Sequence, residues 1–595
     1  MKGIIHFIIV IGACQLSIAQ PSTAYTISFE NAVHHEAEIS ATFTNLKEEV
    51  VEFRMARTSP GRYALHEFVK NVYNVKATDG KGNILNTSRP DPYSWHVSGH
   101  DGTLNVSYTL FANHGDGTYA QIDETHAHLN IPPTFMYVPG LAADEIHVTF
   151  DVREDLNWKI ATQLEKVSDD TYRAPNFQYF MDSPVEISDH DVRSFELDGQ
   201  KINFVLHHNG SDEELDSYFG KVKRIVLQQK GIFGELPKFD YGEYSFLACY
   251  LPNVTGDAME HRNSTVLTTT RSLANEGMSR NLGSVSHEFI HVWNVERIRP
   301  QSLEPFDFSA ADMSGELWFA EGFTNYYSGL TRCRAGLIGK EDYLEGMTGT
   351  FNYVWNFPGR RFYNPIEMSY QAPFVDAAKA VDQHNRDNTF ISYYSYGQML
   401  GLALDLSLRE LGLNLDDYMK LVWSRFGKTE KPYTIQDLQN TLNDYVGKDF
   451  GDWFFNNYIH KSEMPDFKRL FERVGVTLTQ DANKVYFGAI VEKGIITSNP
   501  RIDSPAYIAG LEKGDKIIEA GKTIFNEFLD FNKIVSAAKP GYKLDVVFER
   551  FGLRKETIVI FKKDPAYTIS LFEENGLDLT VKQEIARAEW LDSKE

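Results

Sequence analysis

The sequence predicts a multidomain α+β protein with a β-rich N-terminal domain, a mainly helical middle domain and a smaller C-terminal domain that contains strands. Its 595 residues are enough for about three to five domains. Alternating apolar and polar residues between positions 22 and 205 predict strands, whereas apolar stripes of helical period prevail from 212 to 465. Strand-like runs return between 475 and 563.

The N-terminal domain is expected to span residues 20–210 and to be β-sandwich-like. Its clearest β-rich runs are residues 25–29, 37–43, 50–55, 104–110 and 145–152. Turn pairs such as Asp79-Gly80 and Asp101-Gly102 separate runs of this kind. Repeated short strands between turn signals are typical of two packed sheets.

The middle domain is expected to span residues 211–466. Ser211 followed by Asp212 and Glu214 predicts the start of its first helix. One strand is expected at 244–251, and helices at 282–293, 316–330, 397–411 and 435–446.

Composition excludes several classes of protein. Apolar residues make up 42% and charged residues 24%, which is ordinary for a folded chain and excludes wholesale disorder. A net charge of -23 argues against a general nucleic-acid binder, which would carry a basic surface. Only 3 cysteines are present, so a disulfide scaffold is excluded.

The N-terminus indicates export. Lys2, an apolar run over 4–13 and a small-x-small exit ending at Ala19 are typical of a secretory signal peptide covering residues 1–19. The segment ending at Cys14 also matches a lipoprotein cleavage site, so a lipid anchor is the alternative. We expect a periplasmic or cell-surface protein without a transmembrane segment, because no later stretch is apolar enough to span a bilayer.

A His-Glu-x-x-His run at residues 287–291 is a candidate metal site. On a helix, His287 and His291 share one face and can reach one Zn²⁺, with Glu288 beside them as a general base. The alternative is a helix with two packing histidines and a solvated glutamate.

A catalytic zinc needs a third protein ligand and an open fourth position. Glu321 is the best candidate, because a carboxylate in the apolar run at 317–323 is costly unless it is paired or binds metal. Its alternative is a salt bridge to an arginine such as Arg297. His126 and His128 form a rival pair, but their segment has no nearby partner pattern, so we expect one Zn²⁺ per chain, on His287, His291 and Glu321.

The stretch from His287 to Pro300 resembles the zinc helix of the glycyl aminopeptidase family. That family consists of gluzincin zinc peptidases with an N-terminal β domain, a thermolysin-like catalytic domain and a C-terminal PDZ domain. Further similarity lies at 59–61, 182–187, 256–261, 318–327 and 392–397, so that it covers nearly the whole chain. Two residues depart from the family pattern: Asp257 replaces a usual Gly, and Tyr396 replaces a usual Lys.

The resemblance implies a zinc aminopeptidase that prefers small N-terminal residues, Gly and Ala. It implies that Glu260 binds the free α-amino group of a peptide substrate, with Gly256, Met259 and His261 shaping the same wall. It also implies that a tyrosine donates to the oxyanion; we expect Tyr394, with Tyr393 as the alternative. Read without the family, the alternative for Glu260 is an edge-strand residue in a surface salt bridge, and the alternative for the tyrosines is aromatic packing.

The C-terminal domain is expected to span residues 467–565, followed by a tail at 566–595 with a short helix at 584–591. The stretch 504–518, with Ala509-Gly510-Leu511 and Gly514-Asp515, resembles the PDZ domains of bacterial proteases. A PDZ domain captures peptide C-termini by strand addition. Two other functions therefore stay open: a PDZ peptide-binding adaptor with a vestigial metal site, and an envelope endopeptidase.

Overall fold

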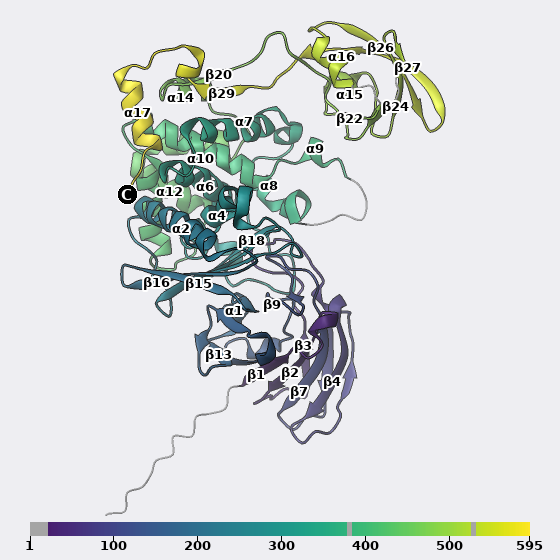
Figure 1. The fold of residues 1–595 in the computed structure, drawn as a ribbon, viewed down its shortest axis with the longest axis vertical. Helices are drawn as coiled ribbons and strands as arrows, with labels where there is room; N and C mark the ends of the chain where they lie inside the picture. The colour runs from purple at the N-terminus through teal and green to yellow at the C-terminus, as the bar shows by residue number, and fades with distance from the viewer. Residues whose placement is uncertain (1–21, 378–383, 525–530) are drawn as a thin grey trace, which may run out of the picture.

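The computed structural model describes residues 22–377, 384–524 and 531–595, which form three parts along the chain (Figure 1). An N-terminal sheet-rich domain and a helical middle domain are both present, which confirms the expected multidomain α+β class. The predicted signal peptide, and Cys14 with it, lies outside the described residues.

Three sheets build the N-terminal domain. The largest runs in the order β12-β13-β10-β1-β2-β7-β4, with bounds Glu165–Lys166, Thr171–Ala174, Ile146–Asp151, Thr23–Ser28, Glu36–Phe43, Leu104–Phe111 and Val72–Asp79. A second sheet, β3-β6-β5, consists of Val50–Arg54, Ser94–Ser98 and Asn86–Ser88. A third, β11-β14-β9-β8, consists of Lys159–Thr162, Val185–Ser188, His126–Leu129 and Gln121–Ile122. Alternate residues of β1 and β2 are buried, as expected for strands packed on one face.

The N-terminal domain ends earlier than the predicted boundary at residue 210. Strands β15 (Asp191–Leu197) and β16 (Gln200–His208) pair with each other, and β16 pairs in parallel with β17 (Glu243–Tyr250). They therefore belong to the five-stranded sheet β15-β16-β17-β19-β18 of the middle domain. The sequence pattern identified the strands but could not show with which sheet each one pairs.

The five-stranded sheet carries the helices of the middle domain on its face. Strand β18 (Asp257–His261) runs antiparallel to β19 (Ser264–Thr268) and forms one edge of the sheet. Helix α2 (Asp212–Phe233) begins with a capping box between Ser211 and Glu214, the predicted helix start. The other main helices are α4 (Leu282–His291), α5 (Leu317–Ala320), α6 (Gly322–Arg334), α7 (Lys340–Asn356), α10 (Tyr393–Glu410), α11 (Leu415–Val422), α12 (Ile435–Val446) and α13 (Lys448–Phe454).

Two glycines allow helices α6 and α10 to approach closely. A Cβ atom on Gly322 would lie 2.3 Å from the Cα atom of Gly397, and one on Gly397 would lie 1.8 Å from the carbonyl oxygen of Trp318. Neither position therefore tolerates a side chain. Because Gly322 follows Glu321 and Gly397 lies three residues after Tyr394, this crossing sets the two side chains relative to each other.

The C-terminal part has a smaller core of its own than the sequence suggested. Its buried apolar residues run from Val485 to Phe561, around a six-stranded sheet with helices α15 (Pro505–Ile508) and α16 (Phe531–Ala537). The strands of that sheet are Val491–Glu492, Ile495–Ile496, Lys516–Ala520, Thr523–Ile524, Lys543–Arg550 and Leu553–Ile560.

The segments that flank this core belong to the helical domain (Figure 1). Helix α14 (Phe467–Glu472), the antiparallel pair β20 (Val476–Thr479) and β29 (Thr568–Leu571), and helix α17 (Val581–Leu591) all bury apolar side chains in it. Trp590, for example, is fully buried and donates to the Tyr326 hydroxyl at 2.9 Å. The expected domain start at 467 and the expected tail from 566 therefore both cut into the core of the helical domain.

This arrangement predicts opposite outcomes for two truncations. A chain that ends at residue 465 loses α14, β20, β29 and α17. We expect it to misfold, because the loss of their buried apolar side chains leaves a large cavity in the core of the helical domain. Thr479 and Thr568 are paired residues, so an Asn-Gly hairpin turn can replace residues 480–567. We expect that excised chain to fold and keep its metal, as checked by circular dichroism and metal analysis. A folded, metal-binding chain ending at 465 would contradict this account of the core.

Across the parts of the chain that the structure describes, no helix combines the length and the apolar character needed to cross a membrane.

Candidate active site

Helix α4 brings the two predicted histidines together. The Nε2 atoms of His287 and His291 lie 3.1 Å apart, on adjacent turns of the helix. His291 is buried and His287 is partly exposed, so the pair lies between the protein core and an open cleft. The i, i+4 spacing in the sequence was sufficient to predict this pair.

Glu321 completes the expected group of three. Its Oε2 atom lies 3.5 Å from Nε2 of His287 and 3.3 Å from Nε2 of His291. That oxygen is buried and has no hydrogen-bond partner among the described residues. The alternative pairing with Arg297 is wrong, because the guanidinium of Arg297 instead donates to the carbonyl oxygens of Arg262 and Val292.

The spacing of these three atoms fits a metal ion. Ligands at about 2.0–2.1 Å around a tetrahedral Zn²⁺ lie about 3.4 Å from one another. Two imidazole nitrogens and one carboxylate oxygen, with an unsatisfied buried oxygen aimed between the nitrogens, form a donor set that zinc accepts. The three residues therefore suit a metal with an open fourth position toward the cleft.

Negative charge gathers around His291. The carboxylates of Glu260 and Glu288 have oxygens within 4.8 Å of a nitrogen of His291 and of each other, and Glu321 adds a third carboxylate. Burial, together with the neighbouring carboxylates, raises the pKa of Glu288 well above its usual range. Although burial opposes it, the charges of Glu260 and Glu321 raise the pKa of His291 to about 10. A bound cation would relieve this concentration of buried charge.

A cleft of about 540 Å³ opens beside this group. Of the predicted site residues, His287, Glu288, Gly256 and Tyr394 line it. The Tyr394 ring lies 5.9 Å from the His287 ring, centroid to centroid, at the start of helix α10. The alternative, Tyr393, is buried and stacks behind Tyr394 with centroids 4.9 Å apart.

Strand β18 sends its side chains to two sides. Asp257, Met259 and His261 face the N-terminal domain, where Asp257 pairs with Arg62 and His261 Nδ1 lies 2.8 Å from Asp182 Oδ1. A Cβ on Gly61 of that domain would lie 2.2 Å from Met259 Sδ, which shows how tightly they pack. Glu260 lies near Glu288 and His291, and its carboxylate also borders the N-terminal domain, because a Cβ on Gly61 would lie 3.2 Å from Glu260 Oε2.

The predicted substrate wall is therefore divided. Of these residues only Gly256 lines the cleft. Glu260 lies behind the lining, beside the histidines, whereas Met259 and His261 make contacts between domains. Tyr396, at the second position that departs from the family pattern, is fully buried and also lies outside the cleft lining. Asp257, at the first such position, does line the cleft, together with Arg62.

Comparison with protein families agrees with this geometry. Residues 24–189 match the Peptidase M61 N-terminal domain, and residues 280–400, which include His287, His291, Glu321 and Tyr394, match M61 glycyl aminopeptidase. Two regions of the chain are therefore similar to the two domains of M61 peptidases.

Solved structures extend the similarity to the whole fold. An aminopeptidase N family protein from Idiomarina loihiensis superposes with a TM-score of 0.83 at 24% identity, covering 96% of this chain and 100% of that one. At that identity the likeness shows the fold alone. An M1 zinc metallopeptidase from Deinococcus radiodurans covers 74% of this chain and 94% of its own, with 13% identity and a TM-score of 0.45. No curated protein matches the chain in sequence.

Asn294 was not among the predicted site residues, yet it holds one of the candidate metal ligands in place. The carbonyl oxygen of Asn294 lies 2.5 Å from Nδ1 of His291, which leaves Nε2 free to face Glu321. The amide of Asn294 donates to the carbonyl oxygens of Phe319 and Ala320, both at 3.1 Å, and so ties α4 to the segment that precedes Glu321.

Tyr63 reaches the same centre from the N-terminal domain. Its hydroxyl donates to Oε1 of Glu321 at 3.2 Å, and its ring belongs to the core of the helical domain. Sequence reasoning missed Tyr63 and Asn294, because a backbone carbonyl and a contact across 258 residues leave no spacing pattern. The turn Ser59-Pro60-Gly61, two residues before Tyr63, was the available signal.

Proposed function

We propose that this protein is a gluzincin-type zinc aminopeptidase that releases small N-terminal residues, Gly and Ala, from peptides. The observation that carries the proposal is the position of Glu260, a buried carboxylate beside the base and the metal-binding histidines. A carboxylate so placed can bind a substrate's α-ammonium and set the first peptide bond at the reactive centre. The preference for Gly and Ala rests on the M61 family rather than on the dimensions of this cleft.

His287, His291 and Glu321 would hold the zinc. When bound, zinc supplies a Lewis acid that activates water and polarises the scissile carbonyl. Tyr63 and Asn294 orient two of its ligands, as hydrogen-bonding partners of metal ligands commonly do.

Glu288 acts as the general base in this proposal. It accepts a proton from the attacking water and returns that proton to the nitrogen of the leaving amine, so that no net proton is consumed in the two steps. Burial and neighbouring carboxylates raise its pKa, and a cation on the adjacent histidines would offset that rise and favour the ionised form that accepts a proton.

Tyr394 donates a hydrogen bond to the carbonyl oxygen as that oxygen gains charge. Its place in the lining of the cleft, beside His287, supports this role over Tyr393. Glu260 holds the ammonium, and the two charges compensate each other in a site that is largely shielded from water.

Blocking the substrate's amino group tests the proposed role of Glu260. An N-acetylated peptide has no ammonium and leaves a buried carboxylate unpaired, so we expect kcat/KM at least about 100-fold below that of the free peptide. Glu260→Ala should impair cleavage of the free peptide and reduce the difference in kcat/KM between the free and the acetylated peptide. Its metal content should not change. Equal cleavage of both peptides by the wild type would favour the endopeptidase alternative.

Replacing each of the two tyrosines tests the oxyanion donor. Tyr394→Phe removes only a hydroxyl, and we expect kcat to fall by about 100–1000-fold with KM little changed. Tyr393→Phe is the matched control, because the Tyr393 ring is buried behind Tyr394. This variant should keep near-normal turnover. The reverse ranking would assign the role to Tyr393.

We also propose that the C-terminal part acts as a PDZ domain that captures peptide C-termini. A groove of about 450 Å³ lies between the stretch 486–490 and helix α16, and Arg501 lines it beside Phe357 of the helical domain. An extended peptide in that groove would place its carboxylate near this guanidinium.

Export to the periplasm or cell surface, with or without a lipid on Cys14, is proposed on the N-terminal sequence alone.

A further inference from the structure

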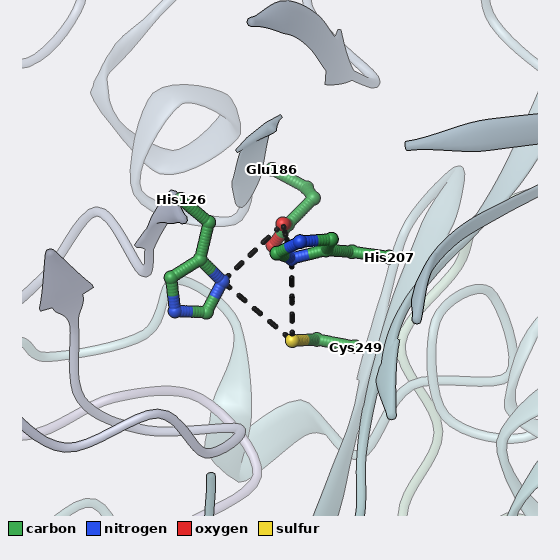
Figure 2. A group of neighbouring side chains, drawn as sticks. All are labelled: His126, Glu186, His207 and Cys249. Carbon is green, nitrogen blue, oxygen red and sulfur yellow. Dashed lines mark hydrogen bonds and ion pairs between the residues drawn. The ribbon is translucent and has the colours of Figure 1, made fainter. Parts of the chain in front are cut away.

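A second cluster of metal-binding side chains lies where the N-terminal domain meets the five-stranded sheet (Figure 2). His126 on β9 and Glu186 on β14 come from the four-stranded sheet, and His207 on β16 and Cys249 on β17 come from the other. All four are buried, their donor atoms lie within 4.8 Å of one another, and none lines the cleft. Sequence reasoning set His126 aside because its partners lie on three other strands.

The four donor atoms point toward a common centre (Figure 2). Nδ1 of His126 lies 3.6 Å from Sγ of Cys249 and 3.5 Å from Oε1 of Glu186. Nδ1 of His207 lies 3.9 Å from the same sulfur and 3.6 Å from the same oxygen. Around a tetrahedral Zn²⁺, nitrogen and oxygen ligands lie about 3.4 Å apart and nitrogen and sulfur ligands about 3.6 Å apart.

Hydrogen bonding alone does not account for this arrangement. Nitrogen–oxygen contacts of 3.5 and 3.6 Å are longer than ordinary hydrogen bonds. Oε1 of Glu186 is buried and has no hydrogen-bond partner in the described part of the chain. A buried, unsatisfied carboxylate oxygen that faces two imidazole nitrogens and a thiol is the arrangement left when a cation is removed.

Neighbouring groups are placed as outer partners of metal ligands are. Oε2 of Glu186 lies 3.0 Å from Nδ1 of His128, which turns Oε1 toward the cluster. Asp123 Oδ2 faces Nε2 of His126 on the ring side away from the cluster, but at 3.7 Å it is too far away for a hydrogen bond, so the hydrogen-bonded outer partner here is His128. Carboxylates and backbone groups of this kind commonly fix the tautomer and orientation of metal-binding histidines.

We propose that His126, Glu186, His207 and Cys249 bind a structural Zn²⁺ that joins the N-terminal domain to the helical domain. The protein supplies all four ligands, so no open position is left for a substrate, in contrast to the three-ligand centre in the cleft. A thiolate and a carboxylate balance the charge of the ion. Cys249 would bind as a thiolate and release its proton as the metal binds.

This site has a structural consequence for the cleft. Strand β17, which carries Cys249, leads through residues 251–256 into β18, which carries Glu260. A metal that fixes β17 against the N-terminal domain also holds that domain against β18, where Arg62 meets Asp257.

Metal analysis and cobalt spectroscopy of the full-length protein test the proposal. After metal removal and reconstitution with Zn²⁺, we expect two ions per chain in the wild type and one in Cys249→Ala. Cys333→Ala is the matched control, a buried cysteine on α6 outside any metal-binding group of the described residues, and it should keep two.

Substitution with Co²⁺ separates the two sites, because the centre in the cleft contains no sulfur ligand. A thiolate-to-cobalt charge-transfer band is expected in the wild type, in Cys333→Ala and in Glu321→Ala, and it should be missing in Cys249→Ala. If Cys249→Ala does not fold, the band in the wild type, in Cys333→Ala and in Glu321→Ala is sufficient to support the proposal. Absence of this band in the wild type, with only one ion per chain, would overturn the proposal and leave the zinc centre in the cleft untouched.

Discussion

Replacing Glu288 with glutamine is expected to lower kcat by about 100–10,000-fold, the contribution of a positioned general base. Glutamine keeps the size and polarity of the side chain but cannot accept a proton from water. Glu288 is buried and lines the cleft beside His287, so no bulk water substitutes for it in the same geometry. The metal content should stay at the wild-type value, because Glu288 is not a proposed ligand.

Glu296→Gln is the matched control for this result. Glu296 is also buried, lies in the turn segment that follows α4 and is absent from the lining of the cleft. We expect it to retain most of the wild-type kcat. If Glu288→Gln were nearly as active as Glu296→Gln, another base would have to be sought.

Loss of the metal from the cleft is expected to have an effect of at least similar size. Glu321→Ala removes one of three ligands and leaves two histidines, so we expect one ion fewer per chain than in the wild type. Peptide hydrolysis should fall by at least about 1,000-fold, because the metal contributes several kcal/mol to the stabilisation of the transition state. Chelation of the wild type should have the same effect, and added Zn²⁺ should restore activity.

Glu316→Ala serves as the control for that variant. Glu316 is buried five residues earlier, and its carboxylate accepts a hydrogen bond from Ser314 at 2.8 Å rather than facing the histidines. It should keep its full metal content. Undiminished hydrolysis by a wild-type protein shown to be free of metal would contradict a zinc mechanism.

The parts of the site that the sequence predicted are those set by local spacing. His287 and His291 are four residues apart on a single helix, so the period of the helix was enough to place them on one face, with Glu288 beside them. Glu321 could be predicted because a carboxylate within an apolar run needs a partner, although the partner's identity stayed open. The long helices followed from apolar periodicity, and α12 matches its predicted bounds of 435–446.

Contacts between distant segments could not be predicted in this way. Tyr63 reaches Glu321 from another domain, and the four residues of the second cluster come from four strands in two sheets. The packing of the N-terminal domain also determines which side chains of β18 lie near the histidines. Met259 and His261 contact that domain instead. Pairing between remote strands leaves no periodic signal in one sequence.

The domain boundaries expected from the sequence differ from those in the structure for the same reason. Strands β15 and β16 look like further members of the N-terminal β-rich region until their pairing with β17 is known. Strands β20 and β29 flank the C-terminal core in sequence but pair with each other and pack on the helical domain.

Digestion of a peptide library, with the products identified by mass spectrometry, tests the central claim most directly. A zinc aminopeptidase should release single N-terminal residues, Gly and Ala ahead of larger ones, from peptides with free amino termini. The products should vanish with chelator and return with Zn²⁺. Internal cleavage of N-acetylated peptides, or no cleavage by a protein carrying its metal, would contradict the account.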